Sequence, residues 1–302
     1  MLARLDLKVG FSCNNHCRFC VQGDKRSKHA PKSSVELCAE LRKGRSSLEA
    51  VVFTGGEPTV RPDLPELVAA ARALGYRQIQ IQTNGRMLAY RKYAEQLAAR
   101  GVTEFSPALH GHTAELHDGL TCAPGSFEQT VAGIRNVRAM GLPVLTNSVI
   151  TKPNYRDLDR LAALLVELGV SQMQFAFVHP VGSAAEHYDE IVPRMSDVAE
   201  HLQRALGVAR AAGVRVMAEA VPYCVLGEHA DCVAEEHIPP TTVVDADVTI
   251  VDYERYRRQE GKRKGPECAR CAREAQCEGP WREYPERFGF DELRPIAVPK
   301  GG

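Results

Sequence analysis

The chain has 302 residues, with 38 Lys and Arg against 38 Asp and Glu, so its formal net charge is zero. This length suffices for one large domain with an appendage and excludes a small disulfide-bonded scaffold. Hydrophobic residues make up 44% and charged residues 25%, which excludes extended disorder. With no net charge and no run of about 20 apolar residues, we expect no nucleic-acid partner, no membrane partner and a cytoplasmic location.

The predicted strands alternate with amphipathic runs, which is the pattern of βα units in a parallel sheet or barrel. Strands are expected at 5–9, 50–53, 78–81, 103–108, 144–149 and 172–178, with a further apolar run at 214–218. Helices are expected from Ser126, with Gln129 in the capping-box position, from Asn154 and from about Ser196.

Six such units predict an α/β fold with a partial (β/α)6 TIM-like barrel over residues 1–220. Loops at the carboxyl ends of its strands are expected to carry the active site. From about Tyr223 the pattern becomes irregular, and we assign residues 221–302 to a small C-terminal extension. Its basic run from Tyr253 to Lys264 is interpreted as a solvated surface.

Ten cysteines are many for a chain expected in a reducing compartment, where clustered cysteines more often bind metals or act in catalysis than form disulfides. The first group, Cys13, Cys17 and Cys20, has the spacing CxxxCxxC directly after the first predicted strand. A four-iron cluster usually takes four cysteine ligands, so three leave one iron open. The alternatives are a zinc loop and a chance grouping. His16 is interpreted as structural rather than as a fourth ligand.

This spacing resembles that of the radical S-adenosylmethionine (SAM) enzymes. The resemblance implies a 4Fe-4S cluster with an exchangeable SAM, held by the three cysteines. Gly55-Gly56-Glu57-Pro58 at the end of the second predicted strand resembles the GGEP segment of that family, which implies that Gly55, Gly56 and Glu57 contact the amino group of SAM. An ordinary strand-to-helix turn is the alternative. Phe19 matches the family position that lies against adenine, and simple packing is its alternative.

The segment Ala108-Leu109-His110-Gly111 resembles the fourth-strand motif of the family, but Ala108 stands where a ribose-contacting serine is common. We therefore assign the ribose contact to Asn147 on the fifth predicted strand, with a purely structural hydrogen bond as the alternative. The three histidines of this region are interpreted as substrate contacts or as parts of a solvated loop, rather than as a metal site: His110, His112 and His117.

The second cysteine group, Cys268, Cys271 and Cys277, has the spacing CxxCx5C. It resembles the end of the SPASM and twitch domains, which hold auxiliary 4Fe-4S clusters in this superfamily. A fourth ligand must come from upstream, and Cys224, after Pro222, is preferred over Cys232. A zinc site with four cysteines is the alternative. Cys38 has helical spacing with apolar neighbours and is assigned to core packing.

By this resemblance, the chain cleaves SAM reductively to a 5′-deoxyadenosyl radical that abstracts hydrogen from a small metabolite, causing dehydrogenation or epimerisation. An electron donor such as flavodoxin or ferredoxin is implied. A peptide-modifying maturase is the alternative, although only twelve residues precede Cys13, where such enzymes commonly carry a leader-binding domain. A non-catalytic iron–sulfur electron carrier is the second alternative.

Cys122, in the loop before Ser126, is the candidate hydrogen-atom donor for epimerisation. It is expected near a helix N-terminus, which favours thiolate character. An uninvolved loop cysteine is the other interpretation, and oxidation is the preferred outcome.

Overall fold

The computed structural model describes residues 2–23 and 25–297. Its strands are β1 (Arg4–Lys8), β2 (Ala50–Thr54), β3 (Gln78–Thr83), β4 (Glu104–Pro107), β5 (Leu145–Ile150), β6 (Gln172–Phe177), β7 (Arg215–Glu219), β8 (Thr241–Val244) and β9 (Thr249–Ile250). Its longer helices are α2 (Ser34–Arg45), α3 (Leu64–Ala73), α4 (Arg91–Arg100), α5 (Ala114–Thr121), α6 (Ser126–Ala139), α7 (Leu158–Glu167) and α10 (Met195–Ala211). The shorter ones are α1 (Lys25–Lys28), α8 (Ser183–Glu186), α9 (Tyr188–Ile191), α11 (Tyr223–Leu226), α12 (Tyr253–Tyr256) and α13 (Glu283–Phe288).

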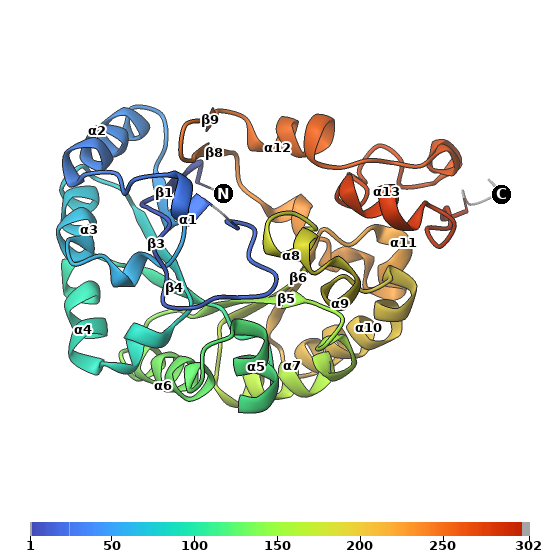
Figure 1. Cartoon of the computed structure of the whole chain (residues 1–302), viewed down its shortest axis with the longest axis horizontal. Helices are drawn as coiled ribbons and strands as arrows, with labels where there is room; N and C mark the ends of the chain where they lie inside the picture. Colours follow the sequence, from blue (N-terminus) through green and yellow to red (C-terminus); the bar gives the residue numbers. More distant parts are fainter. Residues whose placement is uncertain (1, 24, 298–302) are drawn as a thin grey trace.

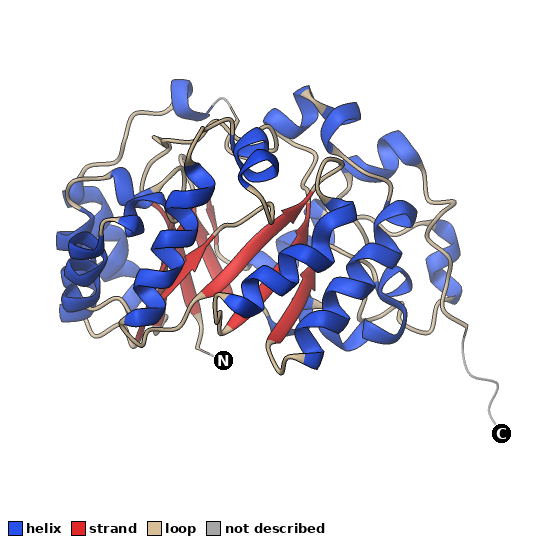
Figure 2. Cartoon of the chain, turned by 90° about the horizontal axis from the view of Figure 1, so that it is seen from below, coloured by secondary structure: helices blue, strands red, loops and turns tan. Residues whose placement is uncertain are grey.

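The strands form a curved sheet with the larger helices on its outer face (Figures 1 and 2). One part has the order β4-β3-β2-β1-β8-β9 and the other β5-β6-β7. Parallel bridges from Phe105 to Val144 and from Ala108 to Asn147 join β4 to β5. The predicted α/β fold with a partial barrel is therefore confirmed. The strand pairs of the described residues do not close the sheet into a ring.

Alternation along the strands separates an apolar outer face from a polar inner face. Leu5 and Leu7 of β1 are almost fully buried, whereas Asp6 and Lys8 between and after them remain partly exposed. Successive side chains of a strand point to opposite faces of its sheet. The leucines therefore pack into the core beneath the helices, and the charged residues line the interior of the barrel.

The C-terminal segment contributes two strands that the sequence pattern did not reveal. β8 pairs in parallel with β1, with Arg4 opposite Thr241, and β9 pairs with β8 in antiparallel orientation. The interpretation of 253–264 as a solvated surface was wrong for two of its cations. Arg257 is 1% exposed and Lys262 is 5% exposed. The division at residue 220 stays a prediction.

Helix α6 begins where the sequence predicted, but not with a capping box. Its N-cap is Gly125, with φ +79° and no side chain to accept a hydrogen bond. Gln129 instead accepts a hydrogen bond from Arg86 Nε at 2.6 Å. The N-terminus of α6 is capped from another helix, by Asp118 of α5.

None of the helices in the described part of the chain has the length and apolar composition needed to cross a membrane.

Candidate active site and second cysteine group

The loop after β1 brings Cys13, Cys17 and Cys20 close to one another. Burial raises the pKa of the Cys13 thiol and of the Cys17 thiol, and the neighbouring Cys20 raises both further. A metal deprotonates the thiols that bind it. Three thiols in one loop at the carboxyl end of a barrel strand are a donor set that fits an iron–sulfur cluster.

Two residues that follow β3 anchor this loop. Asn84 Nδ2 donates to Asn14 Oδ1 at 2.6 Å, and Arg86 Nη1 donates to Asn15 Oδ1 at 2.8 Å. Asn84 Nδ2 also lies 4.0 Å from Cys13 Sγ. The sequence analysis assigned Asn84 and Arg86 no role. The sequence offered one signal for this contact, which is the presence of asparagines in both the cysteine loop and the turn after β3.

The other side of the loop lies against the carboxyl end of α5. The backbone N–H groups of His16 and Arg18 donate to the carbonyls of Thr121 and Leu120 at 2.9 and 3.0 Å. Cys122 is the next residue. It contributes to the raised pKa of Cys17, although burial, Cys20 and Cys13 contribute more. Cys122 is exposed and adopts a left-handed conformation, with φ +49°. It ends α5, whereas the sequence placed it by the N-terminus of the next helix.

Gly55 and Gly56 let the end of β2 approach the cysteine loop closely. The N–H of Gly56 donates to the carbonyl of Gly10 at 2.8 Å, and a Cβ on Gly55, at φ +123°, would lie 2.2 Å from that carbonyl oxygen. A Cβ on Gly56 would lie 2.3 Å from the carbonyl oxygen of Ser12. Glycine is required here because any side chain would displace the loop.

The Glu57 carboxylate is turned into the protein and links β2 to β3. It accepts hydrogen bonds from Thr59 N at 2.9 Å, from Thr59 Oγ1, from Thr83 Oγ1 at 2.6 Å and from the Asn84 N–H. Burial raises its pKa, and these hydrogen bonds partly offset that rise. The side chain of Glu57 is thus already engaged by the protein, and a contact with SAM through this carboxylate would compete with these four donors.

Phe19 and His110 lie next to each other between the cysteine loop and the end of β4. Their ring centroids are 4.7 Å apart, with the rings near perpendicular. The rings of His110 and His117 stack at 5.6 Å, and both histidines are buried, which rules out a solvated loop for these two. Asn147 lies opposite Ala108 across the junction of β4 and β5, and its buried Oδ1 has no partner among the described residues.

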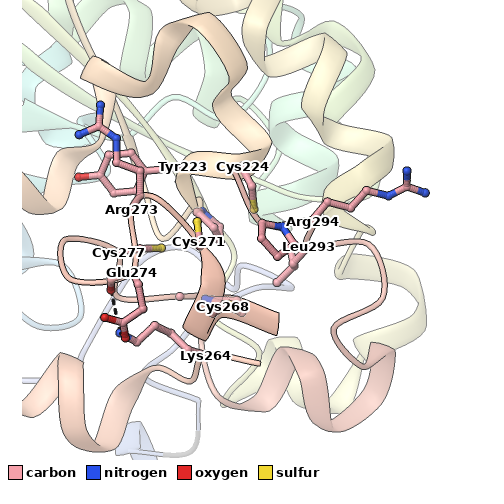
Figure 3. Close-up of a pocket in the computed structure, with 14 residues that line it drawn as sticks. Tyr223, Cys224, Lys264, Cys268, Cys271, Arg273, Glu274, Cys277, Leu293 and Arg294 are labelled. Carbon is pink, nitrogen blue, oxygen red and sulfur yellow. Dashed lines mark hydrogen bonds and ion pairs between the residues drawn. The ribbon is translucent and has the colours of Figure 1, made fainter. Parts of the chain in front are cut away.

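The second cysteine group surrounds one cavity in the C-terminal segment. Cys224, Cys268, Cys271 and Cys277 all line it, as Figure 3 shows. Burial raises the pKa of Cys224 to about 12, with further contributions from the other three cysteines. Cys232 lies elsewhere, beside Arg210 and Asp231. The structure therefore brings together the four cysteines chosen from the sequence.

Four thiols around one cavity fit either a four-iron cluster or a zinc ion as a donor set. Within residues 2–23 and 25–297, no three His, Cys, Asp or Glu side chains converge on the position of a single metal ion. In an iron–sulfur cluster, each cysteine binds a different iron atom, so its ligands need not converge on one point.

A buried ionic network lies between this cavity and the barrel interior. Arg257 donates two hydrogen bonds to Glu278, at 2.9 and 3.0 Å, and Lys262 contacts both Glu235 and Glu278. The Lys262 ammonium also lies 5.1 Å from the centroid of the Trp281 ring. Glu278 directly follows Cys277, so the network holds one end of the second cysteine group.

The sequence profile of the radical SAM superfamily matches residues 7–165, just over half of the chain. Relatives described as probable GTP 3',8-cyclases are 32% identical over 182 residues in Saccharolobus islandicus and Metallosphaera sedula. For the first of these, the match covers 59% of this chain and 58% of the relative. The chain thus spans less than two thirds of the length of these relatives.

Solved structures share the fold at low sequence identity. SuiB from Streptococcus suis, in its complex with S-adenosylmethionine, has a TM-score of 0.69 and 16% identity, and the match covers 92% of this chain and 72% of SuiB. The coproporphyrinogen III oxidase HemN from Escherichia coli, described as a radical SAM enzyme, has a TM-score of 0.52 and 16% identity, over 70% of this chain and 53% of HemN.

Proposed function

The chain belongs to the radical SAM superfamily, and from that premise we propose that Cys13, Cys17 and Cys20 hold its SAM-binding 4Fe-4S cluster and that its substrate is a small polar molecule. When bound and reduced, the cluster and SAM together supply a 5′-deoxyadenosyl radical that abstracts a hydrogen atom. The electron comes from a donor such as flavodoxin or ferredoxin. The chain's own residues bind, orient and shield the reacting groups.

The residues around the cysteine loop hold and shield the site. The N–H of Asn15 donates to Cys13 Sγ at 3.4 Å, and Asn84 Nδ2 lies 4.0 Å from the same sulfur. Hydrogen bonds to the sulfurs are one of the factors that set the reduction potential of a cluster. Phe19 and His110 are 7% and 5% exposed, so little of either side chain is in contact with water. A dry site protects a reactive radical from side reactions.

The polar inner face of the sheet is the observation that carries the substrate class. Gln174 of β6 donates to Glu219, the last residue of β7, at 2.5 Å. Together with Asp6 and Lys8, these side chains offer donors and acceptors to a polar ligand. The relatives are named for GTP, which is also a small polar molecule.

We extend the proposal to an auxiliary 4Fe-4S cluster bound by Cys224, Cys268, Cys271 and Cys277. For the outcome of the reaction we propose dehydrogenation or epimerisation, with cyclisation, as in the name of the relatives, as a third outcome.

The SAM site is tested with the anaerobically reconstituted protein. Two clusters predict about eight irons per chain, and changing Cys13, Cys17 and Cys20 to Ala should leave about four and abolish formation of 5′-deoxyadenosine. Cys38→Ala is the matched control, because Cys38 packs against the core on α2. Undiminished SAM cleavage in the triple variant would overturn the assignment.

The substrate class is tested by adding small polar metabolites or peptides, separated from a cell extract, to the reduced enzyme with SAM. We expect the small polar fraction to stimulate formation of 5′-deoxyadenosine and the peptide fraction to have no effect. Gln174→Leu should weaken the stimulation while the basal cleavage of SAM persists. Stimulation by the peptide fraction alone would favour a peptide-modifying enzyme instead.

A further inference from the structure

Glu219 faces the interior of the barrel at the carboxyl end of β7. It is the last residue of this strand, and it pairs across the sheet with Ala176 of β6. Phe175 and Phe177, on either side of Ala176, are almost fully buried in the core. Ala176 and Glu219 are both partly exposed. Because successive side chains of a strand point to opposite faces, Glu219 lies on the inner face beside a residue that is too small to cover it.

The Glu219 carboxylate has no cation bound to it within residues 2–23 and 25–297. Its one hydrogen bond there comes from Gln174 Nε2, which donates to Oε2 at 2.5 Å. Its other oxygen, Oε1, has no partner and does not belong to the fully enclosed orphan atoms, so it keeps contact with open space. Carboxylates removed from water are ordinarily paired with a cation or with several donors. Glu219 lacks both.

The two nearest cations are engaged by other carboxylates. Lys262 contacts both Glu235 and Glu278, and Arg257 donates two hydrogen bonds to Glu278. These two cations and two carboxylates balance one another in charge. Burial raises the pKa of Glu219, the charge of Glu235 raises it further, and Lys262 and Arg257 only partly oppose this rise. Glu219 is thus a carboxyl group without a counterion of its own.

The charged groups of β1 are engaged as well. Asp6 is paired with Lys8 at 3.1 Å, and Arg4 Nε donates to Thr241 Oγ1 at 3.1 Å. Arg4 opposes the raised pKa of Glu219 by less than the two cations of the network. A positively charged ligand group would therefore supply the counterion that these residues do not.

Tyr253 of α12 brings a second unpartnered group to the same place. Burial raises the pKa of its hydroxyl, and the charges of Glu219 and Asp6 raise it further, so the hydroxyl lies near both carboxylates. Tyr253 is partly exposed, and its hydroxyl makes no hydrogen bond to any residue that the structure describes. Arg257 lies over the ring, 5.0 Å from its centroid, which holds the side chain in position.

The chain leaves β7 in a strained conformation that fixes the direction of Glu219. The next residue, Ala220, is 1% exposed and has φ +57°, in the region that favours glycine. Its N–H donates to Glu235 Oε1 at 2.8 Å, and Lys262 binds the same carboxylate. Such strain persists only where the surrounding structure imposes it, and it is concentrated at functional sites. The C-terminal segment thus positions the end of β7.

We propose that Glu219 binds a protonated amino group of the substrate, with the Tyr253 hydroxyl oxygen as a second acceptor. This inference rests on the proposed function and narrows its substrate class from small polar molecules to small polar amines. An ammonium group supplies the positive charge that Glu219 lacks and three N–H donors for the two acceptors, whereas a neutral hydroxyl group supplies no charge.

The first test divides the small polar metabolites of a cell extract by charge. Cation exchange at neutral pH separates amines from neutral and anionic molecules, and acetylation of the amines in part of the amine fraction removes their charge. Formation of 5′-deoxyadenosine by the reduced holoenzyme with SAM is measured with each fraction. We expect only the untreated amine fraction to stimulate it. Stimulation by the neutral or anionic fraction, or undiminished stimulation after acetylation, would overturn the proposal. Stimulation by peptides alone would instead contradict the small-molecule substrate itself.

The second test removes the charge and keeps the shape of the side chain. Glu219→Gln should raise the concentration of amine fraction that gives half-maximal stimulation at least about tenfold. Glu104→Gln is the matched control, because Glu104 is also held by glutamines on the inner face but lies at the amino end of β4. It should leave this concentration within about twofold. SAM affinity, measured by equilibrium dialysis, should be equal in Glu219→Gln and the unchanged protein. A loss of SAM affinity would show that the carboxylate serves SAM, which would overturn the proposal.

The unfolding midpoint separates a ligand contact from a structural role. Because Glu219 has no ion-pair partner among the described residues, Glu219→Gln should keep or raise the midpoint, whereas breaking a buried ion pair lowers it. Tyr253→Phe, which removes only the hydroxyl, should raise the half-maximal concentration about threefold at an unchanged midpoint. A lowered midpoint in Glu219→Gln together with an unchanged half-maximal concentration would assign Glu219 to the ionic network and overturn the proposal.

Discussion

At the residue scale, the two upstream cysteines of the C-terminal segment have different surroundings. Cys224 lines the cavity with the three cysteines of the second group, and Pro222, which fixes the approach of the chain, is its neighbour two residues before. Cys232 is 5% exposed and lies beside Arg210 and Asp231. Both are cysteines of one short segment, so they form a matched pair of variants.

We expect Cys224→Ala to lose or alter the auxiliary cluster, because the fourth thiolate ligand is removed, and Cys232→Ala to keep it. Iron analysis and EPR spectra of the reduced proteins measure this, with the SAM-binding cluster as the internal reference. An unaltered auxiliary cluster in Cys224→Ala, with its loss in Cys232→Ala, would reverse the assignment. Stoichiometric zinc together with about four irons in the unchanged protein would show that these four cysteines bind zinc rather than an iron–sulfur cluster.

Cys122 poses a different question, since it is exposed and lies next to Cys17 rather than at the beginning of a helix. Epimerisation needs a hydrogen-atom donor, whereas dehydrogenation does not. We expect Cys122→Ala to retain both SAM cleavage and normal product, which is the result for an uninvolved cysteine. The measurement is turnover in deuterated water with the identified substrate. Solvent deuterium at the reacting carbon, lost in Cys122→Ala while SAM cleavage persists, would instead identify Cys122 as the donor.

At the scale of elements, α6 depends on a side chain from the preceding helix. Gly125, its N-cap, offers no acceptor, and Asp118 of α5 accepts hydrogen bonds from the N–H groups of Gly125 and Phe127 at 2.6 and 2.8 Å and from Ser126 Oγ at 2.8 Å. Burial by itself raises the pKa of Asp118, but these hydrogen bonds outweigh it and lower the pKa below its usual value.

Asp118→Ala should therefore lower the free energy of unfolding by about 1 kcal/mol near neutral pH, the usual effect of losing an N-cap. A carboxyl with a lowered pKa stabilises the fold above its unfolded pKa of about 3.9, and the stabilisation is lost as pH falls through the folded value. Urea unfolding at several pH values measures this, and the difference between the two proteins should shrink below about pH 4. Asp291→Ala, at an exposed position, is the control. A difference that stays constant across this range would contradict the role of the charge.

At the scale of the whole molecule, the C-terminal segment both extends the barrel sheet and holds the second cysteine group. β8 continues the sheet beyond β1, and the ionic network of Arg257, Lys262, Glu235 and Glu278 lies between the barrel and the cysteines. Glu235 also accepts a hydrogen bond from the N–H of Ala220, directly after β7, at 2.8 Å. The network thus joins the last barrel strand to the extension.

Removing one buried partner should be more harmful than removing two. Glu278→Leu leaves the Arg257 guanidinium buried without its carboxylate, which costs about 3–5 kcal/mol, whereas replacing a buried pair by apolar residues is often nearly neutral. We therefore expect the double variant Arg257→Met with Glu278→Leu to have a higher unfolding midpoint than Glu278→Leu alone. Glu200→Leu, which breaks the exposed pair with Arg204, is the control and should change stability by less than about 1 kcal/mol. A double variant no more stable than the single one would show that the charges are not coupled.

The sequence by itself determined the features that depend on near neighbours. The strands from β1 to β7 follow from local alternation and apolar runs, and each was predicted to within a few residues. The loop of Cys13, Cys17 and Cys20 and the motif at Gly55-Gly56 follow from short spacings. Parallel strands bring their carboxyl ends to one edge, so the order of the motifs was enough to gather them.

Only the tertiary structure decided what depends on contacts between distant segments. β8 was missed because four residues after two prolines carry no period of their own, and its pairing partner is β1 at the other end of the chain. The burial of Arg257 and Lys262 was missed because a run of charges gives no sign of the carboxylates that will enclose it. The hydrogen bond that His110 Nδ1 accepts comes from the N–H of Val149, 39 residues away along the chain. Local propensity fixes the elements, but burial and hydrogen-bond partners are properties of how those elements pack.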